Sequence, residues 1–280
     1  MMIKPPTSND INRIADWIEL HILYSNTSIS KSKVLSILQK DGVSVEEEDI
    51  DSVITELERR LNLYGKTKPF EIVGTNIFPK LKWKNIPEFT LCLYYSTYGV
   101  GTTAKGAKRD MGTKLFEDIT KSCLENYLQS KGHLFGFPSP LSFKKQLDDF
   151  AKAINEKRFE DPNPHDKDRD VDLIVYKQLD EFRDNCILFF VQCAAGKNWD
   201  EKKTVPIESY RRYMSFCLKA AVSSLAITQV VDMNDWRNAC DDYGIIIDRA
   251  RIFRLLTDKK NIIPKKLNQE IIEWCKTKLN

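Results

Sequence analysis

Two runs of apolar residues constrain the fold more than any other feature of this sequence. Residues 170–176 read DVDLIVY, and residues 186–194 read CILFFVQCA. Runs of valine, isoleucine, leucine and phenylalanine without alternating polar residues are typical of strands covered on both faces. Residues 224–231 (SLAITQVV) and 244–248 (GIIID) predict two further strands. Such strands need helices on both sides of their sheet, so the chain must fold into layers.

Amphipathic segments around these runs predict the helices that cover the sheet. Residues 113–129 carry apolar residues at helical spacing, and the segment HLFGF after them predicts a short first strand. Further helices are predicted at 141–155, at 206–222, from about residue 249 and from about residue 267. The order of the main elements is helix, strand, strand, strand, helix, strand. The predicted fold class is therefore α/β, with a mixed central sheet flanked by helices.

The first part of the chain has a different, mainly helical pattern. Apolar spacing predicts helices at 12–23, from Ser30 onward and at 46–63. The third of these helices has an acidic first turn, which suits the positive end of a helix dipole and predicts a solvated helix start. Residues 70–78 predict a strand, whereas residues 89–95 (FTLCLYY) form a buried element whose type the pattern leaves open. We expect a small domain of winged-helix type.

A glycine- and lysine-rich stretch separates the two patterns. Residues 98–114 read YGVGTTAKGAKRDMGTK and have no apolar periodicity, so we place the boundary there. Residues 1–98 would form the helical N-terminal domain, for recognition or partner contact, and residues 99–280 would form the α/β domain. The stretch approaches a phosphate-binding loop motif, but it lacks the lysine and the hydroxyl residue of that motif, which argues against an ATPase.

Composition narrows the class of protein. The 280 residues are 42% hydrophobic and 30% charged, with a net charge of only +3, which excludes both a disordered chain and a histone-like binder. No run of about 18 apolar residues is present and the start lacks a secretory signal, so we expect a soluble, cytoplasmic protein without membrane contact. The seven cysteines contain no C-x-x-C pair, and the three histidines are far apart. Neither a disulfide framework nor a zinc site is indicated.

Polar residues follow at the ends of the two apolar runs and predict a site there. Asp170 and Asp172 have the same strand parity, so both carboxylates would project from one face at the start of the first run. The second run ends near Gln192, and Lys197 follows Gly196. Carboxylate and amide oxygens can bind Mg²⁺, which makes hydroxide available from bound water, while a lysine screens phosphate charge. These are the parts of a divalent-metal phosphodiesterase, although Asp170 is equally suited to solvating a turn.

At these residues the chain resembles the PD-(D/E)XK, or restriction-endonuclease-like, nucleases. The resemblance covers roughly residues 113–232. The glutamate of that family's first core helix matches Glu117, and the acid of its second core strand matches Asp172. The family's Asp/Glu-x-Lys triplet matches Gln192-Cys193-Ala194, so alanine stands at the lysine position. The nearest basic replacement is Lys197, three residues later.

The resemblance implies a restriction-endonuclease-like core for the second domain. It implies catalytic roles for Glu117, Asp172, Gln192 and Lys197, and a Mg²⁺ or Mn²⁺ ion held by Asp172, Glu117 and Gln192. If Lys197 replaces the missing lysine, its ammonium group must lie near the Asp172 carboxylate. We therefore expect these two side chains within salt-bridge reach or joined by one water.

Basic residues cluster outside these motifs, and we expect two clusters to contact DNA phosphates. They comprise Lys105, Lys108, Arg109, Lys114, Lys202 and Lys203. A third basic segment, DRARIFRLL, begins near Arg249 and is equally compatible with an internal ion pair.

Two functional hypotheses follow. The first is a magnesium-dependent endonuclease that cuts DNA in restriction or phage defence, with a partner protein of a defence system or as a homodimer. The second is a catalytically inactive nuclease-fold protein that binds nucleic acid or a partner protein. The position of Lys197 relative to Asp172 distinguishes them.

Overall fold

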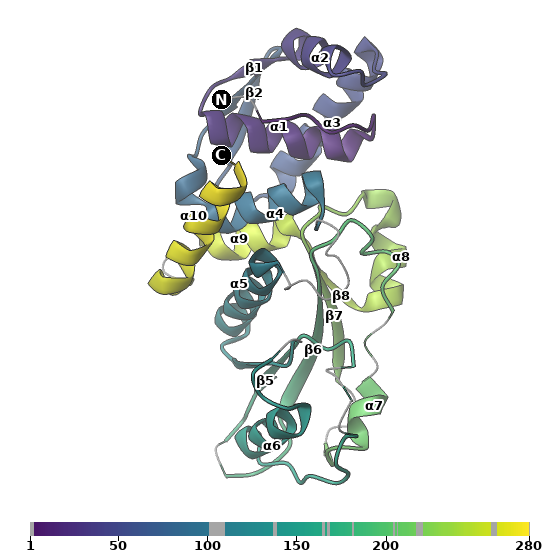
Figure 1. Ribbon diagram of the computed structural model, residues 1–280, viewed down its shortest axis with the longest axis vertical. Coiled ribbons are helices and arrows are strands. Elements are labelled where there is room, and N and C mark those ends of the chain that lie inside the picture. The colour runs from purple at the N-terminus through teal and green to yellow at the C-terminus, as the bar shows by residue number, and fades with distance from the viewer. Residues whose placement is uncertain are drawn as a thin grey trace.

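The computed structural model shows a mixed α/β protein with a small helical part stacked on a larger sheet (Figure 1). The structure describes residues 3–100, 110–136, 139–163, 166, 169–180, 182–203, 205, 207–216, 221–258 and 262–279.

The N-terminal part contains the three predicted helices and a three-stranded antiparallel sheet. Its elements are α1 (Ile11–Ser25), β1 (Ile29–Ser30), α2 (Lys31–Lys40), α3 (Glu47–Leu63), β2 (Phe70–Val73) and β3 (Asn76–Pro79). The sheet order is β1-β3-β2. The single strand predicted at 70–78 is therefore a hairpin, because Gly74 adopts a φ of 61° and turns the chain.

The acidic start of α3 is a solvated helix terminus, as predicted. The Asp49 carboxylate accepts a hydrogen bond of 2.8 Å from the backbone N–H of Glu46. Lys31 of the neighbouring helix α2 forms ion pairs with Glu47 and Asp51, at 3.2 and 2.5 Å. The acidic side chains thus cap the helix and pair with α2.

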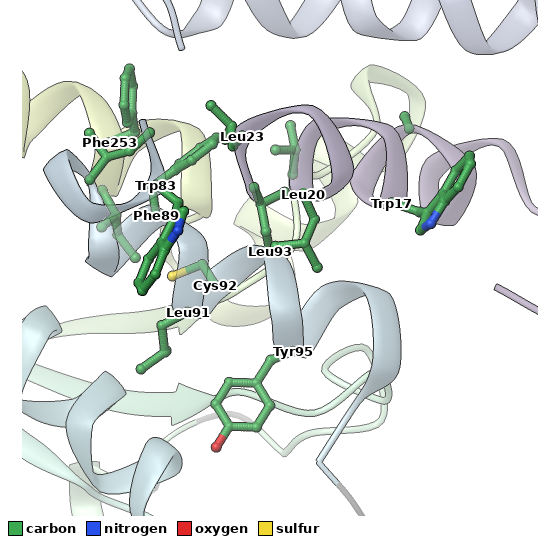
Figure 2. Close-up of a cluster of buried hydrophobic side chains, with 14 of the residues drawn as sticks. Trp17, Leu20, Leu23, Trp83, Phe89, Leu91, Cys92, Leu93, Tyr95 and Phe253 are labelled. Carbon is green, nitrogen blue, oxygen red and sulfur yellow. The ribbon is translucent and has the colours of Figure 1, made fainter. Parts of the chain in front are cut away.

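A central helix connects the two parts of the molecule. After the short 3₁₀ helix η1 (Trp83–Asn85), residues 89–95 belong to helix α4 (Pro87–Tyr98), which settles the type of that element. Helix α4 is buried almost all round, because α1 covers one side of it and the C-terminal helices α9 (Arg249–Asp258) and α10 (Lys265–Leu279) cover others. Figure 2 shows side chains of α4 packed among Leu20 and Leu23 of α1 and Phe253 of α9.

The second part is built on a five-stranded mixed sheet with the order β4-β5-β6-β7-β8. The strands are β4 (Lys131–Leu134), β5 (Leu173–Lys177), β6 (Ile187–Ala194), β7 (Val222–Ile227) and β8 (Ile245–Ile247). Strands β4, β5 and β6 are antiparallel neighbours, whereas β6, β7 and β8 run parallel. The predicted mixed central sheet is therefore confirmed.

Helices cover both faces of this sheet. Helix α5 (Met111–Leu128) packs on the face that carries Leu173, Val175 and Val191. Helices α6 (Phe143–Ala153) and α7 (Ile207–Arg211) pack on the opposite face, against Ile174 and Phe190. The first of these cores continues through α4 to α1, so the N-terminal part and the sheet share one hydrophobic cluster.

Near the end of the sheet one prediction was wrong and one helix was not predicted. The helix predicted at 206–222 ends at Arg211, because Met214 pairs with Arg158 in an isolated bridge and Phe216 has a φ of 22°. A helix that the sequence pattern did not indicate, α8 (Met233–Tyr243), lies between β7 and β8. Its N-cap is Asp232, which accepts a hydrogen bond from the backbone N–H of Asn234. No helix in the described part of the chain is long and apolar enough to cross a membrane.

Candidate functional site

The ends of three strands meet at one edge of the sheet, where Asp172 is held by its backbone. The N–H groups of Phe135 and Gly136, just after β4, donate to the carbonyl oxygen of Asp172 at 2.8 and 3.2 Å. The N–H of Asp172 donates to the carbonyl oxygen of Val191 on β6 at 3.1 Å. Asp172 is thus fixed between β4 and β6 at the start of β5.

The side chain of Asp172 turns toward the end of β6. Its Oδ2 atom accepts a hydrogen bond of 2.7 Å from the backbone N–H of Cys193. Arg169 and Asp170, which lie three and two residues before Asp172, both adopt positive φ angles, 51° and 62°, a conformation that aspartate tolerates better than most residues. Asp170 itself is exposed in this turn. Asp172, and not Asp170, is therefore the aspartate that the turn directs onto the sheet.

Glu117 approaches the same edge from helix α5. Its side chain is buried, with 3% of the residue exposed. A Cβ atom added at Gly136 would lie only 2.5 Å from Glu117 Oε2, so the glycine leaves the space that this carboxylate occupies. The N–H of Gly136 bonds to the backbone carbonyl of Asp172, so Gly136 lies between the Glu117 carboxylate and the backbone of Asp172. The assignment of both acids to one site stays a prediction.

Gln192 is buried next to this point, but it faces the other way. By the alternation of side chains along β6, it shares a face with Phe190 and Ala194, whereas Val191 contacts the face covered by α5. Its exposed fraction is 4%, and its Oε1 atom has no hydrogen-bond partner in the described part of the chain. A buried amide oxygen without a hydrogen-bond partner is unusual in a folded protein. Such an atom either binds a ligand or lowers the stability of the fold.

A cavity of about 680 Å³ opens beyond the end of β6. Its lining includes Ala194, which occupies the position of the family's lysine, together with Lys197 and Lys202. Thr113, one helical turn before Glu117, also lines it, as does Cys193, whose N–H binds Asp172. The cavity therefore lies beside the two acids, and both of the lysines that line it come from the loop after β6.

Lys197 points from this cavity toward the N-terminal part. A Cβ atom added at Gly99 would lie 3.2 Å from Lys197 Cε, so the lysine stem runs along the end of α4. Burial lowers the pKa of Lys197 and Arg13 lowers it further, whereas Asp10 and Asp16 act in the opposite direction. None of the ion pairs between described residues joins Lys197 to Asp172. The lysine thus lies close to Arg13 of α1, in a position that the sequence pattern did not indicate.

The remaining predicted basic residues are dispersed. Lys114, Lys202 and Lys203 are exposed, and Lys202 lies in the cavity lining. Lys105, Lys108 and Arg109 lie outside the described residues. Arg249 is not a surface residue, because it is fully buried and pairs with Asp16 at 2.5 Å. The ion pair considered within this segment is thus not the one observed, because the partner of Arg249 is Asp16 of α1.

The donor atoms at the strand ends fit a hard divalent cation. Mg²⁺ in proteins keeps several water molecules and uses one or two carboxylates, which Asp172 and Glu117 can supply. The unpaired Oε1 atom of Gln192 is an additional oxygen nearby in the chain. Within the described ranges, no group of three or more histidine, cysteine, aspartate or glutamate side chains could hold a metal ion by itself.

Three residues of this region have no strong sequence signal. The position of Thr113 could have been found, because it precedes Glu117 by four residues on one helix. Gly136 is a glycine after a predicted strand, which is a weak sign of a close approach. Arg13 could not have been found, since it is 184 residues away from Lys197 in the chain.

Comparison with known proteins identifies no family for this chain. No protein family matches it, and no curated protein matches it in sequence. Among solved structures, the restriction endonuclease FokI is similar with a TM-score of 0.19 and 10% identity, over 86% of this chain and 42% of FokI. FokI bound to DNA is similar with the same TM-score and 11% identity, over 85% and 43% of the two chains. The chain spans less than half of the FokI chains, and matches with so low a TM-score carry no argument about fold or activity.

Proposed function

We propose that this protein is a nuclease that uses Mg²⁺ or Mn²⁺ to hydrolyse phosphodiester bonds of DNA, in restriction or phage defence. The observation that carries the proposal is that Gly136 adjoins both acidic residues, through the Glu117 carboxylate and the backbone carbonyl of Asp172, near a cavity lined by two lysines. The order α5, β4, α6, β5, β6, α7, β7 supports it, since apart from the additional helix α6 it agrees with the order expected from the resemblance to PD-(D/E)XK nucleases. The defence role rests on that resemblance alone.

Each residue has a distinct part in this proposal. Asp172 and Glu117 would hold the metal ion, and the hydrogen bond from the Cys193 N–H fixes the Asp172 carboxylate in one orientation. When bound, the ion supplies a hydroxide from water at neutral pH and neutralises charge on the phosphate. Lys197 and Lys202 line the cavity in which a phosphate would lie next to the acids. Gln192 faces the other side of the sheet, so its unpaired oxygen is not assigned to an ion held by Asp172 and Glu117.

A single substitution tests the assignment of Asp172. We expect Asp172→Asn to abolish cleavage of plasmid DNA in Mg²⁺, because it removes a ligand charge, while the thermal unfolding midpoint stays within a few degrees. Asp170→Asn is the matched control, since this exposed aspartate lies two residues earlier in the same turn, and it should cleave like wild type. Reactions in EDTA, and with RNA in place of DNA, complete the set.

The assignment fails if Asp172→Asn cleaves as fast as wild type. Cleavage that persists in EDTA would contradict the metal requirement, and cleavage of RNA alone would contradict the choice of DNA. Light scattering with and without DNA tests the predicted homodimer.

A second candidate function is DNA or partner binding without catalysis. It is favoured by Ala194 at the lysine position and by the direction of Lys197, which lies against Gly99 and near Arg13. This function predicts DNA binding in EDTA together with no cleavage by the wild-type protein in Mg²⁺ or Mn²⁺. The plasmid assay therefore separates the two candidates before any variant is made.

A further inference from the structure

A second, smaller cavity lies on the other side of Lys197. It has a volume of about 210 Å³ and is lined by the segment Lys4 to Ser8, by Arg13, by the end of α4 and by Lys197. Lys197 lines both this cavity and the larger one at the end of β6. The N-terminal segment and the loop after β6 therefore both line the smaller cavity, so this cavity lies between the two parts of the molecule.

The wall of this cavity is held in place by hydrogen bonds. The hydroxyl of Tyr98 on α4 donates to the carbonyl oxygen of Lys4 at 2.7 Å and ties the N-terminal segment to the central helix. The hydroxyl of Ser8 accepts from the backbone N–H of Asp10 at 3.1 Å, which leaves its own hydrogen available to another acceptor. Both contacts fix the backbone and consume none of the cationic groups.

The cavity carries positive charge and has no acidic residue in its described lining. Its cations are Lys4, Arg13 and Lys197, and none of them takes part in an ion pair between described residues. The nearby acids serve other groups. Asp10 accepts from the backbone N–H of Arg13 at 2.8 Å, and Asp16 pairs with the buried arginines Arg60 and Arg249.

Two cations that line one cavity repel each other. Burial lowers the pKa of Lys197 and the charge of Arg13 lowers it further, although Asp10 and Asp16 oppose this shift. Folding keeps the two groups beside one cavity in spite of that cost. An anion between them would remove the repulsion, and arginine and lysine side chains both bind phosphate, arginine with two parallel hydrogen bonds and lysine as a point charge.

We propose that this smaller cavity binds a backbone phosphate of nucleic acid through Arg13 and Lys197, with Lys4 at its rim. This site rests on the proposed function and extends it. A DNA strand with one phosphate in the smaller cavity would continue past Lys197 into the larger cavity, near Asp172 and Glu117. A polymer fits this arrangement better than a free phosphate does, since one lysine serves two adjacent cavities.

DNA binding in EDTA tests this site without any contribution from cleavage. We would measure the affinity of a fluorescently labelled duplex for the full chain by anisotropy across a range of KCl concentrations. Arg13→Gln and Lys197→Gln should each weaken binding and should each reduce the slope of log affinity against log salt by about one. Lys152→Gln is the control, because this exposed lysine on α6 lies at the far end of the molecule (Figure 1) and should change neither quantity.

Two results would overturn the proposal. One is a salt slope and an affinity for both variants that equal those of wild type. The other is that the variants keep full DNA affinity but no longer bind inorganic phosphate, as measured by phosphorus NMR. The cavity would then bind a small anion and not DNA. The nuclease assignment is tested separately. If the wild-type protein does not cleave plasmid DNA, the binding measurement in EDTA can still be made and still tests the phosphate site.

Discussion

Two pairs of cationic side chains in this molecule differ in what surrounds them. Arg60 and Arg249 lie in the shared core, where Arg60 contacts Asp16 and Glu19 at 2.6 and 2.9 Å and Arg249 contacts Asp16 at 2.5 Å. All four side chains are at most 4% exposed. Arg13 and Lys197 lie beside a cavity without a carboxylate partner among the described residues. The partners of a charged residue, more than its type, therefore indicate whether it stabilises the fold or is available to bind a ligand.

The buried network is electrostatically balanced. Burial by itself would raise the pKa of Asp16, but Arg249 and Arg60 outweigh it and lower that pKa. Burial raises the pKa of Glu19, although both arginines oppose it, and the hydroxyl of Tyr64 donates to Glu19 at 2.7 Å. Because the network joins α1, α3 and α9, it links the N-terminal part to the C-terminal helices.

The largest expected effect comes from breaking this network. Arg249→Met should lower the free energy of unfolding by about 3–5 kcal/mol, because it leaves buried carboxylates without one of their cations. Urea denaturation measures the loss. Arg254→Met, on an exposed position of the same helix, should change stability by less than about 1 kcal/mol. A loss below about 1 kcal/mol for Arg249→Met would contradict a structural role for the buried charge of Arg249.

A smaller effect is expected at the strand ends. Gly136→Ala should destabilise the protein by about 1–3 kcal/mol, because the new methyl group overlaps the Glu117 carboxylate. The same change should reduce Mg²⁺-dependent cleavage by displacing Glu117. Gly196→Ala is the matched control, since nothing lies within 4 Å of its added Cβ atom. Equal unfolding midpoints for the two variants would contradict the close approach of Glu117 to Gly136.

The smallest expected effect concerns Glu88, a buried acid that is not paired with an arginine among the described residues. Burial raises the pKa of Glu88, while Asn268 donates to its Oε1 atom at 3.0 Å. The folded state therefore holds this proton more tightly than the unfolded state does, so stability falls as the pH rises above the ordinary carboxyl value of 4.5. Glu88→Gln removes that loss, and its stability relative to wild type should increase between pH 4 and pH 8.

Denaturation at several pH values measures this difference. Glu58→Gln, at an exposed position of α3, provides the comparison and should show no such trend. A relative stability of Glu88→Gln that stays constant with pH would show that Glu88 is ionised in the folded state as easily as in the unfolded state.

The sequence predicted the elements whose pattern is local. Strands β5 and β6 follow from continuous apolar runs, and the position of Asp172 at the start of one and Gln192 near the end of the other follows with them. Helix α8 escaped prediction, because its apolar residues are few and its N-cap Asp232 is a weak signal alone. The helix predicted at 206–222 was too long, since a bridge between Arg158 and Met214 overrides local propensity there.

Contacts between distant segments could not be predicted. Asp16 and Arg249 are separated by 233 residues, and nothing in either local pattern indicates that they pair. The direction of Lys197 is decided in the same way, by Gly99 and Arg13 from the other part of the chain. The site was therefore predictable where it depends on strand order, and unpredictable where it depends on how the two parts pack.

The central position of α4 has a consequence for synthesis on the ribosome. Helices α1 and α4 emerge before the sheet, but α9 and α10, which cover the rest of α4, emerge after it. Until then the apolar sides of α4 and the carboxylates of Asp16 and Glu19 lack the contacts of α9 and α10, including Arg249. The nascent N-terminal part therefore stays incompletely packed until α9 and α10 have been synthesised, and chaperones that bind exposed apolar helices have a defined target during that interval.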